Sequence, residues 1–183
     1  MRFTQIALLS SPILAFTIPE GQTDGVYQVS YVDGQEIHTL VNQTDRTAQS
    51  PPSPGLTASA KFRAKRDAHP YITCGGDALD HGYTDKANAE LDKQCGNGAW
   101  VNAGHDFYSI ANCVVAYYCN FYITSNTCSA VDRRTASADI TNKCGRYQSG
   151  WARSSNDWGG DSYGYEDFCK APGNNFCGRG THG

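Results

Sequence analysis

The chain has 183 residues, including eight cysteines, and its 15 lysines and arginines against 18 aspartates and glutamates give a formal net charge of −3. This acidic balance argues against nucleic acid as the main partner, because phosphate binding needs a positively charged surface. All eight cysteines lie between Cys74 and Cys177, so a thiol-free N-terminal part precedes a cysteine-rich part.

The first residues are typical of a secretory signal peptide, which we place at residues 1–16. Arg2 supplies a positive charge, and the apolar stretch Ile6–Phe16 follows it. This stretch is too short to span a bilayer, which takes about 20 apolar residues. Ala15 is a small residue at a suitable cut point. The alternative, a buried N-terminal helix, fits less well, because the even number of thiols also indicates an oxidising compartment. We therefore expect a secreted, extracellular protein without stable membrane insertion.

Residues 17–66 are predicted to be a propeptide. Tyr27, Val29 and Tyr31 alternate with polar residues before the turn signal Asp33-Gly34, so a short hairpin is expected, although a lone hairpin is only marginally stable in water. Asn42 begins a glycosylation sequon, Asn-Gln-Thr. The proline and serine residues that follow predict an extended linker.

The basic pair Lys65-Arg66 is the predicted end of the propeptide. A dibasic pair after a flexible linker is a natural substrate for a kexin-type or furin-type endoprotease, whose acidic subsites pair with both side chains. The alternative is an ordinary run of solvated charges. A second pair, Arg133-Arg134, falls inside a predicted helix and is interpreted as surface charge. Cleavage after Arg66 would release a domain of residues 67–183, in which thirteen acidic residues outnumber nine basic ones.

The cysteines are predicted to form four disulfides. They are Cys74, Cys95, Cys113, Cys119, Cys128, Cys144, Cys169 and Cys177. Zinc binding is the alternative, but the spacings contain no Cys-x-x-Cys pair, and no two histidines fall at ligand spacing. We therefore expect neither a metal nor another cofactor. The sequence leaves the pairing open, because eight cysteines allow many connectivities.

The first predicted elements of the domain are a strand and a helix. Pro70–Cys74 is a strand candidate that Gly75-Gly76 would end. Thr84 is predicted to cap a helix that runs to about Gln94. Gly96 then fits the left-handed position after a helix.

A long strand and a second helix follow. Ala99–Ile110 is predicted to be extended. Cys113–Ile123 is the strongest strand in the chain, because β-branched and aromatic residues dominate both of its faces, and it should be central in a sheet. Ser129 is predicted to cap the second helix, with Asp132 three positions on, and that helix should end near Cys144-Gly145.

Arg146–Arg153 and Ser162–Cys169 are predicted to form a final pair of strands. The two helices resemble each other, because Ala87–Cys95 and Ala136–Cys144 each carry an alanine, an aliphatic residue and a cysteine on one face before a glycine. Duplication and coincidence explain this equally well. The predicted fold class is α+β, a two-layer α/β sandwich with two helices on one face of an antiparallel sheet and four disulfides.

The layout of signal peptide, linker, dibasic site and cysteine-rich domain resembles the small secreted cysteine-rich fungal proteins regarded as effector candidates. The domain also resembles the killer toxins of smut fungi, which adopt a disulfide-bonded α/β sandwich and act on calcium channels. The similar residues are Ile72–Cys74, Leu91–Gly98, Ala116-Tyr117, Cys128, Cys144-Gly145 and Tyr165–Cys169. The resemblance implies the same fold. It does not imply channel block, because the toxins need a basic residue before the long central strand, and the matching stretch Val101–Asn112 has no lysine or arginine.

The segment Trp151–Phe168 contains the densest group of aromatic residues beside short acids and glycines. Such a surface suits a glycan or a protein, because the rings provide apolar area and the polar neighbours fix orientation. The candidate binding residues are Trp151, Trp158, Tyr163 and Tyr165, although Trp151 and alternate tyrosines would also suit a core. The pattern favours a secreted effector or killer-toxin-like protein that binds an extracellular or host protein, with a lectin-like carbohydrate-binding module as an alternative.

A small secreted hydrolase of ribonuclease type is another class of function. It would need a histidine with a carboxylate or a second histidine within hydrogen-bond reach. The available residues are His105 or His81, with Glu90 or Glu166 as the partner. No serine or thiol nucleophile is supported, so binding is favoured over catalysis.

Two further histidines, His69 and His182, lie near the termini of the predicted domain and are given no role.

A membrane-active toxin is the last class of function considered. It would favour a cationic amphipathic surface, which an acidic domain does not provide.

Overall fold

The computed structural model of the protein describes residues 16–41, 69–155, 159–170 and 173–177. Its elements are β1 (Gly25–Val32), β2 (Gln35–Leu40), β3 (Tyr71–Ala78), α1 (His81–Cys95), β4 (Ala99–Val101), β5 (Asp106–Ala111), β6 (Val114–Asn120), β7 (Asn126–Cys128), α2 (Ala130–Cys144), β8 (Gln148–Arg153) and β9 (Asp161–Asp167).

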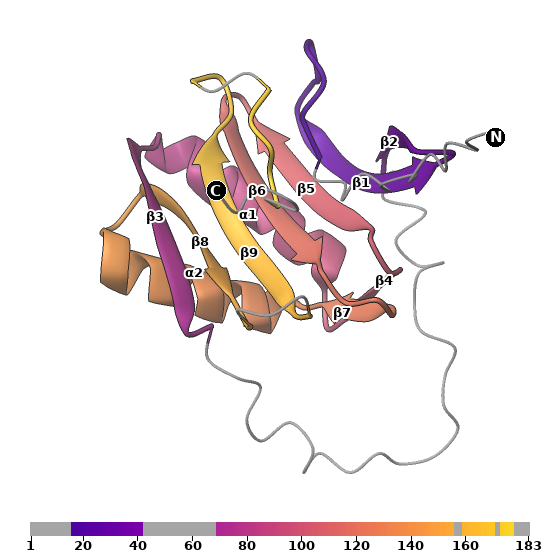
Figure 1. Cartoon of the computed structure of the whole chain (residues 1–183). Helices are drawn as coiled ribbons and strands as arrows, with labels where there is room; N and C mark the ends of the chain where they lie inside the picture. Colours follow the sequence, from indigo (N-terminus) through magenta and orange to yellow (C-terminus); the bar gives the residue numbers. More distant parts are fainter. Residues whose placement is uncertain (1–15, 42–68, 156–158, 171–172, 178–183) are drawn as a thin grey trace, which may run out of the picture.

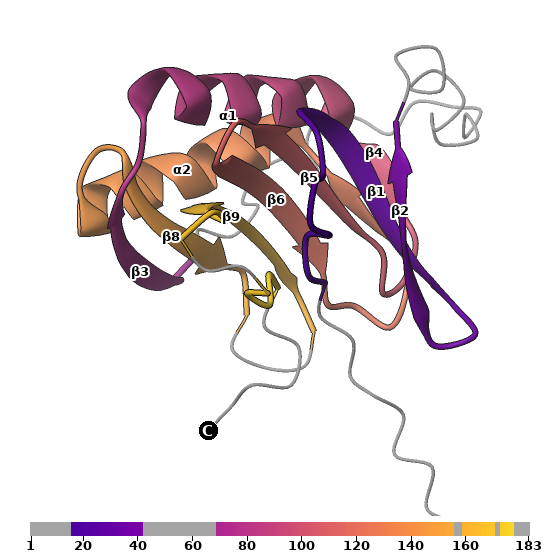
Figure 2. The ribbon, with the colours of Figure 1, turned by 90° about the horizontal axis from the view of Figure 1, so that it is seen from above.

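Seven of these strands form one antiparallel sheet in the order β2-β1-β5-β6-β9-β8-β3, and β4 pairs with β7 in a small second sheet (Figure 1). Figure 2 shows that both helices lie on the same side of the large sheet. The predicted fold class, an α+β sandwich with two helices on an antiparallel sheet and four disulfides, is therefore confirmed.

Each helix begins at a side-chain cap, and one of the two caps was predicted correctly. Ser129 caps α2, as predicted, by accepting a hydrogen bond from the N–H of Asp132 (3.2 Å). The prediction that Thr84 caps α1 is wrong, because Asp80 accepts from the N–H of Tyr83 (2.9 Å) and takes that role one turn earlier. Thr84 lies in the first turn, where its hydroxyl donates to the Asp80 carbonyl (2.6 Å). Both helices end within one residue of their predicted ends.

The central strand is β6, as predicted, and all of its residues are buried. The stretch 99–110 is not continuous, because a turn separates β4 from β5, and β7 was not predicted. Gly75-Gly76 does not end β3, which continues to Ala78 after a register shift opposite β8. Gly75 suits this strand because it packs directly on Ser149, where a Cβ would overlap the serine hydroxyl.

The hairpin expected in the predicted propeptide forms, and it extends the large sheet. Strand β1 pairs with β2 on one side and with β5 on the other. Val26, Tyr27 and Val29 of β1 are buried. Packing on the large sheet thus supplies the stabilisation that an isolated hairpin lacks. We call residues 16–41 the N-terminal segment.

The two faces of the large sheet have different covers. Helices α1 and α2 cover one face, with Leu91 and Ile140 in its core. The other face, which we call the helix-free face, is covered by residues that precede β1, including Phe16 and Ile18, and by residues 173–177 (Figure 2). Phe16 and Phe176 from these two segments form a β-bridge, and both are buried.

Every cysteine is paired, which confirms the predicted disulfides. The pairs are Cys74–Cys144, Cys95–Cys128, Cys113–Cys169 and Cys119–Cys177. The first two join the C-terminal end of each helix to a strand, and the last two join the C-terminal residues to β6 or to the turn before it. Four disulfides indicate folding in an oxidising compartment. In the described part of the chain, neither helix is long and apolar enough to cross a membrane.

One of the two arginines interpreted as surface charge is instead buried between the helices. The guanidinium of Arg133 forms paired hydrogen bonds with Asp92 of α1 and donates to Asn88 (2.7 Å). Arg134 also reaches Asp92 (2.8 Å) but is exposed, as predicted. A planar guanidinium suits a shared carboxylate, so Arg133 joins the two helices.

Candidate functional site

A polar pocket of about 280 Å³ lies at the end of the sheet where the β6–β7 connection and the β8–β9 connection meet. His69, which precedes β3, forms one wall. The β6–β7 connection and β7 contribute Tyr122, Asn126 and Thr127, and the first turn of α2 contributes Asp132. Ser154 and Asp161, at the two ends of the β8–β9 connection, complete the lining. We call this cavity the His69 pocket.

His69 is buried yet not fully satisfied. Its side chain is only 5% exposed, and Nδ1 has no hydrogen-bond partner among the described residues. Nε2 lies 3.9 Å from Oδ1 of Asp161, and the ring meets the Tyr163 ring edge-on, with 5.6 Å between centroids. A buried polar atom without a partner is costly unless water or a ligand satisfies it. His69 therefore places at the wall of the pocket a ring nitrogen, Nδ1, that has no partner among the described residues.

Asp161 is the acidic group beside His69. Its N–H donates to the Ser154 hydroxyl (2.9 Å), which fixes the start of β9, and its Oδ2 accepts from Nδ2 of Asn126 (3.2 Å). Burial raises the pKa of the Asp161 carboxyl, and the neighbouring Asp132 raises it further, against opposing effects of the Ser154 hydrogen bond and of His69. The carboxyl thus keeps its proton to a higher pH than an exposed aspartate does.

Three exposed apolar residues line the pocket or are direct neighbours of residues that line it. Tyr122, which lines it, is 39% exposed, and the next residue, Ile123, is almost fully exposed. Trp100 of β4 is also exposed, and its cross-strand partner Thr127 lines the pocket. We call Trp100, Tyr122 and Ile123 the apolar rim. Exposed apolar side chains beside a polar cavity are typical of a recognition surface.

The His69 pocket combines two carboxyl groups, an amide, hydroxyls and an imidazole. Carboxyl and amide oxygens accept hydrogen bonds from hydroxyl or ammonium groups of a ligand, and the aromatic rings of the rim add apolar contact area. The imidazole and the nearby carboxyl can also exchange a proton with a bound group. The arrangement can bind a cationic or hydroxyl-bearing group, and it can support acid–base chemistry on it.

A larger cavity of about 400 Å³ between the helices is a weaker candidate. Its lining includes Asp92, Arg133 and Ser137, and these side chains satisfy one another, since Arg133 binds Asp92 and donates to the Ser137 hydroxyl (3.0 Å). A network that is already satisfied has less to gain from a ligand than a site at which a ring nitrogen of His69 lacks a partner among the described residues.

The aromatic binding surface predicted from the sequence is not assembled by its described members. Tyr163 and Tyr165 are buried on the helix-covered face, whereas Trp151 packs on the helix-free face. The reason is strand alternation: Trp151 lies opposite Gly164, so the tyrosines on either side of Gly164 point the other way. Tyr163 nevertheless supports the new site, because its ring contacts His69.

Several predicted residues lie outside the described part of the chain. They are Trp158, the processing pair Lys65 and Arg66, and the glycosylation residue Asn42, so their roles stay predictions. Gly159, the residue after Trp158, lies beside the apolar rim: a Cβ at Gly159 would be 3.9 Å from the ring of Tyr122.

The two histidines predicted for a hydrolase contact other groups. Nδ1 of His105 lies 3.1 Å from Nε2 of Gln28 in the N-terminal segment. The ring of His81 stacks on Tyr147, with 3.9 Å between centroids. Neither contact resembles the histidine–carboxyl pair that acid–base catalysis requires.

The two carboxylates proposed as their partners are also engaged. Glu90 pairs with Lys93 on the surface of α1. Glu166 accepts a hydrogen bond from the Tyr117 hydroxyl, and burial raises the pKa of its carboxyl. A histidine and a carboxyl instead meet in a cavity at His69 and Asp161.

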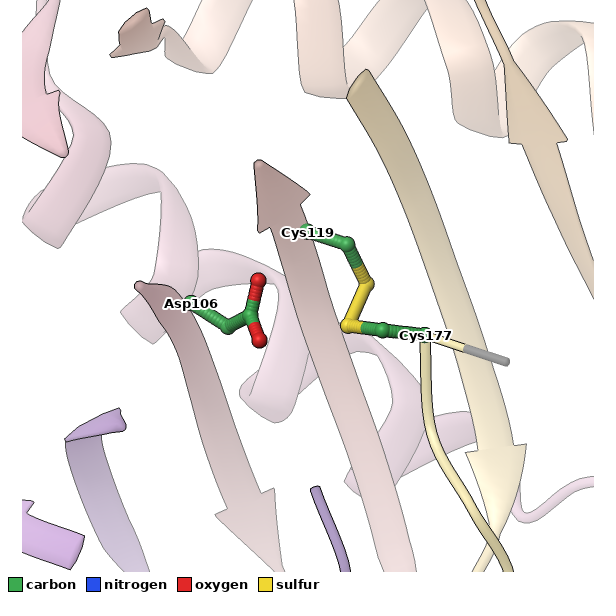
Figure 3. Close-up of side chains that lie close together, drawn as sticks. All are labelled: Asp106, Cys119 and Cys177. Carbon is green, nitrogen blue, oxygen red and sulfur yellow. A yellow bond between two sulfur atoms is a disulfide. The ribbon is translucent and has the colours of Figure 1, made fainter. Parts of the chain in front are cut away.

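Two clusters of potential metal ligands each contain a disulfide. In the first, Asp106 on β5 lies beside the bond between Cys119 on β6 and Cys177 (Figure 3). Oδ1 of Asp106 accepts from the N–H of Asn120 (3.0 Å). The second cluster surrounds Cys113–Cys169. Cysteine binds metals as a thiolate, so neither cluster offers sulfur ligands while its disulfide is intact.

Sequence reasoning passed over His69 because it lies near the start of the predicted domain. In the structure, His69-Pro70 leads directly into β3, whose pairing with β8 fixes the position of His69. The signal that could have found it was the strand predicted to begin at the next residue.

Comparisons with known proteins found no matching family model, no matching curated protein and no matching solved structure. The resemblance to effector candidates and to smut-fungus killer toxins therefore stays a prediction.

Proposed function

We propose that the protein is a secreted, disulfide-stabilised protein of the effector or killer-toxin type, which binds an extracellular or host target through the His69 pocket and the apolar rim. The predicted signal peptide and the four disulfides support secretion, because disulfides form and persist in oxidising compartments. The order of signal peptide, propeptide and cysteine-rich domain supports a fungal origin.

The observation that carries the binding proposal is the state of His69. Its Nδ1 has no partner in the described part of the chain, although the side chain is buried and lines a cavity. Buried polar groups in native proteins are normally satisfied. An unsatisfied one, in a residue that lines a cavity, supports a place for a ligand group.

The pocket favours a cationic or hydroxyl-bearing group, because its walls include the carboxyl groups of Asp132 and Asp161. We favour a target protein that inserts a basic side chain. The rim includes the aliphatic Ile123 beside Tyr122, and an aliphatic side chain suits a protein surface better than the face of a sugar. A glycan, read by Tyr122 and the pocket hydroxyls, is the alternative.

The test adds the purified protein to leaf tissue and to fungal cultures, and screens it on a glycan array. The assay that responds is repeated with Tyr122→Ala and with Asp161→Asn, each of which we expect to reduce the response by about tenfold or more. Tyr83→Ala is the matched control, because Tyr83 on α1 is 40% exposed against 39% for Tyr122. A response that survives both pocket substitutions, or that Tyr83→Ala abolishes equally, overturns the proposal.

A secreted hydrolase is the second candidate, because an imidazole and a carboxyl lie 3.9 Å apart in the pocket at His69 and Asp161. This distance is longer than a hydrogen bond, but catalytic hydrogen bonds are often long before substrate binds, so such a pair can act as acid and base. The acidic surroundings disfavour a phosphodiester and favour an uncharged polysaccharide.

Hydrolysis of RNA and of cell-wall polysaccharides by the wild type, His69→Ala and His105→Ala separates the options. Loss of activity in His69→Ala alone supports a hydrolase at the His69 pocket. Loss in His105→Ala alone supports the site predicted from the sequence. Absence of hydrolysis by the wild type removes this candidate.

A further inference from the structure

We propose that cleavage after Lys65-Arg66 leaves the N-terminal segment bound to the domain, so that the processed protein consists of two non-covalently associated chains. The surface that binds this segment is the edge of β5 that faces β1, together with the ring of Tyr108 on β5. Its occupant is residues 16–41 of the same chain. The predicted processing site lies outside the described residues, whereas the contacts that carry the proposal lie within them.

Strand β1 makes β5 an interior strand. The two strands pair antiparallel from Gly25↔Ile110 to Val29↔Asp106, and every residue of β5 is buried. Without β1, the N–H and C=O groups along this edge of β5 would lose their partners. The domain therefore depends on β1 to complete its sheet.

Tyr108 of β5 is enclosed by the N-terminal segment. Its ring stacks on Phe16 and on Tyr27, with 5.1 Å between centroids in each case. Its hydroxyl lies 2.7 Å from Nδ1 of His38. All three partners belong to the N-terminal segment, and Tyr108 is fully buried. Buried aromatic anchors of this kind carry most of the affinity of protein interfaces.

The ends of the contact are also fastened. The N–H of Phe176 donates to the carbonyl of Phe16 (2.9 Å), and the two rings lie 5.7 Å apart between centroids. The Cys119–Cys177 disulfide holds the neighbouring backbone of Phe176 against β6. Beyond the strand, Asp24 pairs with Lys86 of α1 (2.8 Å). The interface thus spans from the helix layer to the helix-free face.

The burial of Phe16 also locates the first cut. The predicted signal peptide covers residues 1–16, and removal of Phe16 with it would take away a ring stacked on Tyr108. A cut after Ala15 keeps Phe16 as the first residue of the bound chain. The contacts of Phe16 therefore favour the cut after Ala15.

No disulfide would join the two chains, because residues 1–73 contain no cysteine. In the cleavage, water adds to the Arg66–Asp67 peptide bond and yields the Arg66 carboxylate and the Asp67 amine, with a kexin-type protease as catalyst. Retention afterwards depends on strand pairing and side-chain packing alone.

The test treats the purified, oxidised full chain with a kexin-type protease. We expect one size-exclusion peak that contains both fragments in native buffer, and two separate masses after denaturation without reduction. A chain with a viral-protease site inserted between residues 56 and 57 makes the result independent of the dibasic pair. Separation of the fragments in native buffer at micromolar concentration overturns the proposal.

A pair of substitutions checks that retention uses β1. Val29 is fully buried on β1, whereas Ile37 on β2 is exposed. We expect Val29→Asp to weaken retention by about 100-fold or more, because a charge would enter an apolar interior, and Ile37→Asp to change it little. Disulfide mapping and circular dichroism verify the fold of residues 67–183 in both variants. Equal retention in two folded variants contradicts the proposed interface. If Val29→Asp misfolds, size-exclusion chromatography of the cleaved wild type decides between retention and release.

Discussion

Phe16 and Phe176 lie side by side on the helix-free face of the sheet, but they are attached to it differently. Phe176 precedes Cys177, whose disulfide with Cys119 ties it to the central strand. Phe16 belongs to the N-terminal segment, which is held by pairing with β5 and by stacking on Tyr108. Both side chains are buried. Equal burial therefore does not imply equal attachment.

The same contrast between covalent and non-covalent attachment is found in the rest of the molecule. On the helix-covered face, Cys74–Cys144 and Cys95–Cys128 join each helix to a strand. Every cross-link lies at or beyond residue 74, and the N-terminal segment has none. The boundary between cross-linked and uncross-linked structure coincides with the stretch that contains the predicted processing site.

Among the substitutions considered, Tyr108→Ala should weaken the non-covalent attachment of the N-terminal segment most. We expect it to lower the free energy of unfolding of the full chain by about 3–5 kcal/mol, because it removes a buried ring and leaves a cavity between Phe16 and Tyr27. Denaturant unfolding measures the change, and Tyr83→Ala, on the exposed surface of α1, should stay within about 0.5 kcal/mol of the wild type. A loss below about 1 kcal/mol for Tyr108→Ala would mean that the N-terminal segment is not packed as described.

Removing single disulfides should separate the two kinds of attachment. Replacing both cysteines of Cys119–Cys177, or both of Cys74–Cys144, by alanine should lower the free energy of unfolding by about 2–4 kcal/mol in each case. Only the first change should also weaken retention of the N-terminal segment after cleavage, because only that bond holds Phe176 against Phe16. Size-exclusion chromatography of the cleaved variants measures retention. Equal release in both variants would contradict the role given to Phe176.

Gly164→Ala tests the packing of the helix-free face. A Cβ at Gly164 would overlap the ring of Tyr117, so we expect a loss of about 1–3 kcal/mol in the free energy of unfolding. Gly82→Ala is the control, since a Cβ at Gly82 would meet only Oδ1 of Asp80 at 3.5 Å. Thermal and denaturant unfolding should leave the control unchanged or slightly more stable. A neutral Gly164→Ala would show that Tyr117 does not press on β9.

The pH dependence of stability gives the smallest effect. Burial raises the pKa of the Glu166 carboxyl in the folded protein, so the folded state binds a proton more tightly than the unfolded state does. Its contribution is present below the ordinary value of 4.5 and is lost as pH rises through the folded-state pKa. Glu166→Gln should therefore flatten the decline in stability above that pH. Identical pH profiles for wild type and Glu166→Gln would contradict this.

What the sequence predicted well was local. The apolar run of β6, the cap of α2 by Ser129 and the turn at Asp33-Gly34 each depend on neighbouring residues and can be recognised from a short window. The fold class followed from the order of such elements. The cap of α1 was misplaced by one turn because both Asp80 and Thr84 are good capping residues.

What the sequence did not reveal depends on distant partners. The pairing of residues 25–29 with 106–110 leaves no local signal, so the N-terminal hairpin was expected to stand alone. The alternation that sends Trp151 to one face and Tyr163 to the other becomes visible only once β8 and β9 are in register. The His69 pocket joins residues from five separate stretches of the chain, and no motif unites them.

The native mass of the protein recovered from culture medium decides most directly whether the N-terminal segment is a lasting part of the molecule. We predict a complex of two chains, one beginning at Phe16 and the other at Asp67, which separates on denaturation without any reducing agent. A native mass that equals residues 67–183 alone would contradict this and would make the N-terminal segment a discarded propeptide.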